Sequence, residues 1–405
     1  MEDVHRAIEA VARTSYGRLI AYLSARTRDV AGAEDALSEA LLAALTTWPQ
    51  EGVPQRPEAW LLTTARRRLI DRARHARTRV ESTLTLQLIT EQAEDPMPAE
   101  KFPDERLKLL FVCAHPAIDP DIHTALMLQT VLGLDAARVA RAFLISPTTM
   151  GQRLVRAKAK IRDAGIAFAV PEEHELPQRL DAVLEAIYAA YGSGWEDVAG
   201  VDPRRRGLVD EAIWLARVLV QRMPEQPEAR GLLALMLYCE ARRPARRAPD
   251  GRYIPLSEQD VQAWSAPMTA EAERELFAAA QQARPGRFQL EAAIQSVHAE
   301  RARTGCTDWG AIALFYENLV HLAPTLGARI GHAAAVAEVK GPAAGLTLLD
   351  EIELKVVNTY QPYWAVRAHF LRQLGHATEA SDAFDRAIGL AEDDAVRQFL
   401  LKRRG

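Results

Sequence analysis

Two short segments concentrate basic side chains that could hold a nucleic acid. Residues 146–158 have the sequence Ser-Pro-Thr-Thr-Met-Gly-Gln-Arg-Leu-Val-Arg-Ala-Lys, and the wider segment 135–162 contains seven Lys or Arg residues and one acid. Segment 56–79 contains eight Arg residues and two acids. Positive charge at this density predicts contact with phosphates. A solvated basic helix is the alternative for either segment alone, and two such segments in one chain favour nucleic acid.

The first of these segments has the pattern of a helix-turn-helix. Ser146 is a good N-cap and Pro147 suits the first position of the second helix. A shorter helix is expected before it, over 135–144, and a break of about two residues separates the two helices. The first turn of the second helix would meet base edges. The residues expected to do so are Thr148, Thr149, Gly151, Gln152 and Arg153. Those expected to contact the DNA backbone are Arg156, Lys158 and Lys160.

The Arg-rich segment is expected to form a helix that starts near Glu58. It follows a loop, 49–57, that contains three prolines. Trp60 belongs to its apolar stripe, and basic charge beside an aromatic side chain is typical of sites for single-stranded DNA. Upstream, Asp35 and Glu39 lie four residues apart and share one face of a predicted helix. That pattern alone fits a solvated acidic face as well as a docking surface.

Length and composition predict an all-helical protein of two or three domains. The chain has 405 residues, 48% of them hydrophobic and only 6% aromatic, and strand-like runs of Val, Ile and Thr are nearly absent. Its three cysteines lack CxxC spacing, which argues against a zinc site and for a reducing compartment. Without an apolar leader or spanning segment, we expect a cytoplasmic protein that does not enter the membrane. Phosphate-loop, dinucleotide, metalloprotease and serine-hydrolase motifs are absent, so we expect no enzyme, cofactor or metal.

The chain divides into four parts by charge and helix-breaking residues. We expect a helical bundle over 1–80, a linker over 81–104, a second helical domain over 105–170, and a long helical region over 171–405. The linker contains six acids and one base, together with three prolines. It could imitate a phosphate chain or serve as a spacer.

The long C-terminal region contains a pattern typical of tetratricopeptide (TPR) repeats. The pattern consists of Trp364, Ala368, Leu371, Gly375, Ala380, Phe384 and Ala387. Stacked repeats of this kind form a curved surface that binds a protein or peptide.

Ordered motifs within about residues 1–165 resemble the extracytoplasmic-function (ECF) sigma factors of bacterial RNA polymerase. Residues 33–39, Ala-Glu-Asp-x-x-x-Glu, resemble region 2.2. Residues 57–71, Pro-Glu-Ala-Trp-Leu-Leu-Thr-Thr-Ala-Arg-Arg-Arg-Leu-Ile-Asp, resemble regions 2.3 and 2.4. Residues 146–158 resemble region 4.2, whose recognition helix enters the −35 element. The resemblance implies a region 2 bundle, a region 4 helix-turn-helix domain and a linker that threads toward the polymerase active-site channel.

The resemblance also implies two partners, core RNA polymerase (its β′ clamp and β flap) and promoter DNA. The residues it assigns to polymerase are Glu34, Asp35, Glu39 and Leu42. The residues it assigns to the −10 element, where a loop captures a flipped base, are Trp48, Gln50, Glu51, Gln55, Trp60, Arg66, Arg67 and Arg72. Together with the TPR pattern, the chain resembles the ECF subgroup whose fused C-terminal extension regulates activity. A free-standing helix-turn-helix regulator with a TPR sensor, or a TPR scaffold, is the alternative.

Overall fold

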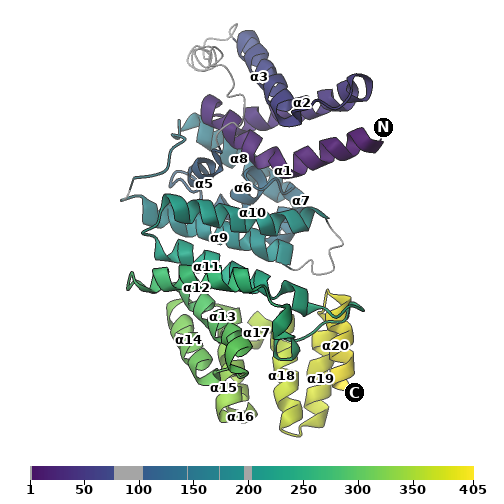
Figure 1. Cartoon of the computed structure of the whole chain (residues 1–405), viewed down its shortest axis with the longest axis vertical. Coiled ribbons are helices and arrows are strands. Elements are labelled where there is room, and N and C mark those ends of the chain that lie inside the picture. The colour runs from purple at the N-terminus through teal and green to yellow at the C-terminus, as the bar shows by residue number, and fades with distance from the viewer. Residues whose placement is uncertain (1, 77–103, 144, 173, 196–202) are drawn as a thin grey trace. The chain divides into compact units, whose positions relative to one another are not determined.

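The computed structural model describes residues 2–76, 104–143, 145–172, 174–195 and 203–405. Within these residues the regular structure is helical, apart from one isolated antiparallel bridge between Arg247 and Tyr253. The prediction of an all-helical fold is therefore confirmed. The chain forms two compact units, Met1–Leu215 and Ala216–Gly405 (Figure 1).

The first unit contains two groups of helices and the first two helices of the predicted C-terminal region. Its helices are α1 (Glu2–Thr27), α2 (Val30–Glu51), α3 (Pro57–Ala76), α5 (Arg106–Cys113), α6 (Pro120–Thr130), α7 (Ala136–Ala142), α8 (Pro147–Asp163), α9 (Leu176–Trp195) and α10 (Pro203–Arg222), the last of which continues past the unit's end. Helices α9 and α10 thus begin within the same compact unit as α1–α8, although the sequence grouped them with 171–405.

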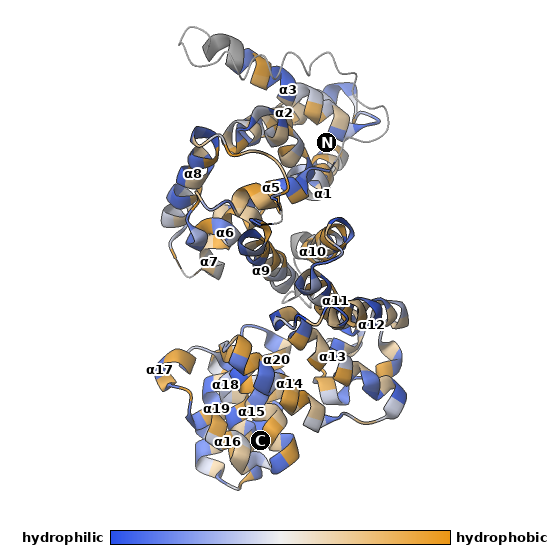
Figure 2. Cartoon of the chain, turned by 90° about the vertical axis from the view of Figure 1, so that its left-hand side faces the viewer, coloured by the Kyte–Doolittle hydropathy of each residue, from blue (hydrophilic) through white to orange (hydrophobic). Residues whose placement is uncertain are grey.

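Apolar residues at helical spacing hold α1, α2 and α3 together. The Asp29 carboxylate caps α2 by accepting a hydrogen bond from the Gly32 N–H at 3.1 Å. Leu37 and Trp48 of α2 and Leu61 of α3 are at most 1% exposed. Figure 2 shows apolar and polar residues alternating around these helices. Glu58 fixes the start of α3, since it accepts hydrogen bonds from Ser15 and Arg18 of α1.

The predicted loop between α2 and α3 is shorter than expected. Helix α2 continues through Pro49 to Glu51, and the Gly52 N–H donates to the Trp48 carbonyl at 2.9 Å. Gly52 has a φ of 86°, which favours glycine and ends the helix. Gln50 and Glu51 therefore lie in the last turn of α2, and only residues 52–56 connect the two helices.

The second unit is built from successive packed helices. They are the last residues of α10, then α11 (Pro227–Ala241), α12 (Ala266–Ala280), α13 (Arg287–Thr304), α14 (Trp309–Leu322), α15 (Leu326–Lys340), α16 (Pro342–Asp350), α17 (Leu354–Val357), α18 (Gln361–Gln373), α19 (Ala377–Gly389) and α20 (Asp394–Arg404). Three short 3-10 helices, Arg243–Arg246, Leu256–Glu258 and Val261–Ala263, lie in the segment between α11 and α12. In Figure 1, α18 and α19 lie side by side.

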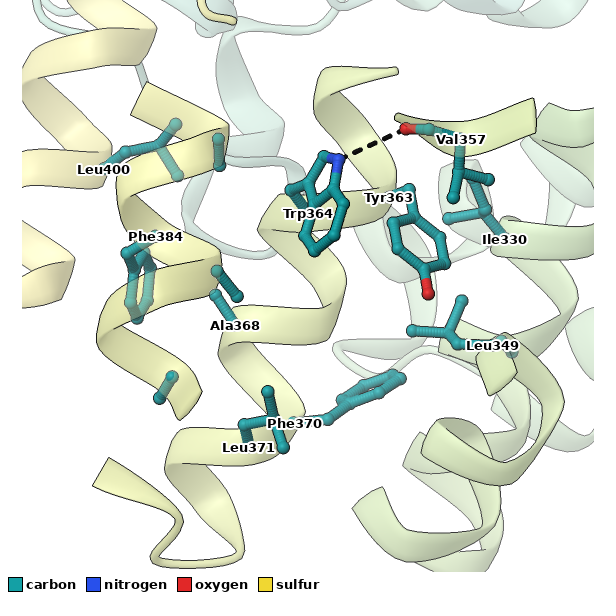
Figure 3. Packing of buried hydrophobic residues seen from close by; sticks show 14 of the residues in the cluster. Ile330, Leu349, Val357, Tyr363, Trp364, Ala368, Phe370, Leu371, Phe384 and Leu400 are labelled. Atoms are coloured by element: carbon teal, nitrogen blue, oxygen red, sulfur yellow. Dashed lines mark hydrogen bonds between the residues drawn. The ribbon is translucent and has the colours of Figure 1, made fainter. Parts of the chain in front are cut away.

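The residues of the predicted repeat share one apolar core. Trp364, Ala368 and Phe384 are buried in a single cluster, and the Trp364 Nε1–H donates to the Val357 carbonyl at 3.2 Å (Figure 3). Gly375 has a φ of 81° in the connection between α18 and α19. The repeat assignment stays a prediction, because packed helix pairs occur in many all-helical folds.

Candidate nucleic-acid interface

The N-terminus of α8 is fixed as the sequence predicts. The Ser146 hydroxyl accepts a hydrogen bond from the Thr149 N–H at 3.1 Å, and Pro147 is the first helical residue. This cap sets the direction of the side chains in the first turn. Of the residues predicted to contact the −35 element, the exposed ones are Thr148, Thr149, Gln152, Arg153, Arg156 and Lys160. Gly151 is half-buried.

The exposed face of α8 carries cations that have no acidic partner among the described residues. Arg153 and Lys160 form no ion pair within the part of the chain that the structure describes. Arg156 donates to a backbone carbonyl, that of Gln152, at 3.3 Å. Three cations with polar neighbours on one helix face are suited to phosphates and base edges.

Lys158 differs from the other predicted DNA contacts because it lies on the buried face of α8. It is 6% exposed, and its Nζ lies 2.5 Å from Glu34 Oε2 of α2. Leu154 and Ile161, each at most 1% exposed, occupy the same face. The sequence placed Lys158 on the DNA backbone; in this structure it is not available to DNA. The spacing of the apolar residues around it would have assigned it to this face.

The predicted polymerase-facing carboxylates lie beside the Arg-rich helix. Arg72 of α3 pairs with Asp35 at 3.1 Å and with Glu39, and the Glu39 carboxylate also lies 3.7 Å from Arg68. Hydrogen bonding to Glu39 raises the pKa of Arg72. Because these side chains are solvent-exposed, the pairs are weak and can be exchanged for other partners. Leu42 belongs to α2, as Asp35 and Glu39 do, and its apolar side chain is 61% exposed beside these acids.

The residues predicted to contact the −10 element fall into two groups. Trp48 is 1% exposed and packs edge-to-face against Trp60, with ring centroids 5.5 Å apart. The prediction that Trp48 presents itself to DNA is thus corrected: it is a core residue that supports the half-buried Trp60. The exposed members are Gln50, Glu51, Gln55, Arg67 and Arg72, while Arg66 is half-buried.

The ion pairs of Arg106 were not predicted from the sequence. Arg106, 7% exposed, pairs with Asp104 at 2.7 Å and with Glu211 of α10, and its guanidinium lies over the ring of Trp214. Local sequence patterns could not predict this contact, because Arg106 lies about a hundred residues from Glu211 and Trp214. This cluster joins α5 to α10. Helices α5 and α6 also pack against α9, and both α9 and α10 begin after residue 170.

Comparison with known proteins identifies the N-terminal helices. Residues 11–79 match the family model of sigma-70 region 2. The chain therefore contains a sigma-70 region 2 domain. It is also 36% identical to the uncharacterized protein R00370 of Rhizobium meliloti (strain 1021) over 390 residues, which cover 95% of this chain and 91% of that protein, so the two belong to one family.

A second family model matches further along the chain. Residues 179–280 match a family of unknown function, DUF6596, whose span starts in α9 and ends with α12. No solved structure matches the chain. Among the described residues, none of the helices combines the length and apolar character needed to cross a membrane. Nor does that part of the chain contain a cluster of three or more His, Cys, Asp or Glu side chains suited to a metal ion.

Proposed function

We propose that the chain is an ECF-type sigma factor, which binds core RNA polymerase and directs promoter-specific initiation of transcription. The observation that carries this proposal is the pairing of a sigma-70 region 2 domain with the capped, basic helix α8 in one compact unit. A regulator that acts without polymerase would not need the acids and exposed Leu42 of α2.

Each exposed group has a role in this proposal. Asp35, Glu39 and Leu42 of α2 contact the β′ clamp of the polymerase. Arg66, Arg67 and the other cations of α3 hold the phosphates of the −10 strand. Gln50 and Glu51 at the end of α2, and Gln55 in the connection that follows, contact an unstacked base. Helices α7 and α8 form the helix-turn-helix that enters the −35 major groove, where Gln152 suits adenine and Arg153 suits guanine. The β flap contacts the same α5–α8 segment.

The C-terminal helices are proposed to modulate this activity. Their buried cluster around Trp364 and Phe384 supports a TPR-like domain that takes a protein or peptide ligand. Residues of the acidic linker, 81–104, lie almost entirely outside the described residues, so their proposed passage into the active-site channel rests on sequence alone.

Run-off transcription tests the proposal. Core RNA polymerase, the full chain and a library of genomic promoter fragments are combined, and the transcripts are sequenced. Initiation at a defined set of promoters, absent with polymerase alone, is the expected result. DNA binding without polymerase, and no added initiation, would instead identify a free-standing regulator. Failure to bind either partner would favour a scaffold.

A further inference from the structure

The row of packed helices in the second unit returns to the place where it begins. Successive helices from α11 to α16 pack on one another, and α18, α19 and α20 continue the row. Residues 243–265, which we call the clasp segment, leave the end of α11 and pass beside α20, the last helix (Figure 1). The clasp segment therefore connects the first helix of the row with the last one.

A tight turn in the clasp segment places two side chains against α20. Arg247 and Tyr253 form the isolated antiparallel bridge, and Gly251, with a φ of 86°, lies in the turn between them. Arg247 pairs with Asp393, the residue that caps α20. The Tyr253 ring packs edge-to-face against Phe399, with ring centroids 5.4 Å apart. The turn thus contacts α20 at its start and near its middle.

The remainder of the clasp segment is attached to α13 and to the end of α20. Arg301 of α13 donates to the Leu256 carbonyl at 2.9 Å and to the Gln259 carbonyl at 3.0 Å. Glu258, between these two residues, pairs with Arg403 of α20 at 2.9 Å. Arg301 bonds backbone atoms, so it fixes the path of the segment on α13, whereas side chains make the contacts with α20.

Little apolar surface holds the clasp segment and α20 in place. Leu400 is the one buried residue of α20, a helix that the structure describes throughout. The apolar cluster that contains Leu400 includes no described residue of the clasp segment. Gln259 Oε1 and Trp264 Nε1 are buried without a hydrogen-bond partner in the described part of the chain, which is costly. Regions of this kind open more easily than the helical core.

We propose that the turn of the clasp segment and α20 form a clasp that closes the second unit, and that the two come free together while α11–α19 stay folded. Both the closed state and its opening are properties of the chain alone. Their use in the control of transcription rests on the proposed modulation by the second unit. A ligand that prefers one of the two states shifts the population toward it, which makes the clasp a switch.

Native-state hydrogen exchange of the full chain measures the opening. The N–H groups of Ala248 and Ile254 are bonded inside the turn, and that of Arg397 is bonded inside α20. After correction for intrinsic rates, these amides should share one opening step and exchange faster than the amides of α18 and α19. Exchange only together with α18 and α19 would overturn the proposal, because the clasp would then not open by itself. Different opening steps for the turn and α20 would overturn it as well.

Three variants test whether the Arg247–Asp393 pair holds the clasp closed. Asp393→Asn retains a side-chain oxygen that can cap α20 and removes the charge. This change and Arg247→Ala should each speed the shared exchange about threefold or more, and the double variant should add little, because both remove the same pair. Arg252→Ala, which removes an exposed cation paired with Asp250 in the same turn, should leave the exchange of α20 unchanged. Fully additive effects of the two changes would refute the clasp.

Run-off transcription separates the clasp from its proposed use. With core RNA polymerase, the Arg247→Ala chain should give an output that differs at least about twofold from that of the Arg252→Ala chain, because its open population is larger. Equal output would overturn the use of the clasp in control. No initiation with the unchanged chain would overturn the proposed function, while the exchange measurements would still decide whether the clasp opens.

Discussion

The guanidinium carbon of Arg106 lies 4.1 Å from the ring centre of Trp214. Arg106 is the first residue of α5, and Trp214 belongs to α10, within the part of the chain that matches the family of unknown function. The same guanidinium pairs with Asp104 and Glu211. The helices that follow the proposed promoter-binding segment therefore help to hold it in place, and are more than a tethered addition.

Replacement of Trp214 tests this support. Trp214→Ala removes the ring beneath Arg106, and we expect a loss of about 1–2 kcal/mol of local stability in α5 and α6. Native-state hydrogen exchange of the full chain measures that loss at individual helices. Trp214→Phe, which retains an aromatic face, should lose less. Unchanged exchange in Trp214→Ala would show that the contact carries no stability.

Whether helices α5–α8 stay folded should depend on where the chain is truncated. A chain ending at Ala169 lacks α9 and α10, and it exposes apolar surface of α6 that packs against α9. We expect it to aggregate or to lose the hydrogen-exchange protection of α6. A chain ending at Met223 retains both helices and should keep that protection. Run-off transcription with the longer form then reports the sign of control by the second unit. Equal protection in both forms would contradict the supporting role.

Local sequence patterns predicted the elements well because local chemistry determines them. Ser146 and Pro147 predicted the start of α8, and that start is confirmed. The three prolines of 49–57 predicted a loop, yet α2 continues past Pro49 to Glu51. Burial of Trp48 against Trp60 favours the longer helix, and a tertiary contact of that kind cannot be read from proline positions.

The partners of charged residues were the least predictable part of the site. Lys158 looks like its neighbours Arg156 and Lys160 in sequence, but its position on the apolar side of α8 places it against Glu34. That contact joins residues 124 positions apart. Only the packing of α8 on α2 decides it, and no pattern within either helix encodes that packing.

Arg153 provides the sharpest test of base recognition by α8. Arg153→Ala should weaken binding of the polymerase complex to its promoter by about 1–3 kcal/mol and relax the preference at one base pair of the −35 element. Competition with promoters substituted at each −35 position measures both effects. Arg162→Ala, which removes an exposed cation near the end of the same helix, should weaken all sequences alike. The same uniform loss in both variants would remove Arg153 from the base-reading set.

Leu42 tests docking on polymerase without disturbing an ion pair. Its side chain is 61% exposed, so Leu42→Asp should leave the free energy of unfolding nearly unchanged. We expect its affinity for core RNA polymerase to fall about 10-fold or more, because an apolar contact becomes a buried charge. Leu314→Asp on α14, where the side chain is 57% exposed, is the matched control and should bind normally. Normal binding by the Leu42 variant would move the docking surface away from α2.

His298 predicts how the second unit responds to acid. Its ring packs edge-to-face against Trp309 at 5.5 Å, and burial, with the nearby charges of Arg242 and Arg301, lowers the pKa of His298 to about 4. The unfolded chain therefore takes up the proton first as the pH falls below about 6.5. Stability is full above that pH and falls toward pH 4, by about 2 kcal/mol between pH 7.5 and pH 5.

Hydrogen exchange of α13–α15 at a series of pH values, corrected for the intrinsic exchange rate, measures this loss. His298→Phe keeps a ring against Trp309 and removes the titrating group, so its stability should depend less on pH over that interval. The exposed His321 of α14 offers a matched control, since His321→Phe should retain the acid sensitivity of the unchanged chain. If His298→Phe shows the same loss between pH 7.5 and pH 5, the sensitivity arises from other groups in the unit.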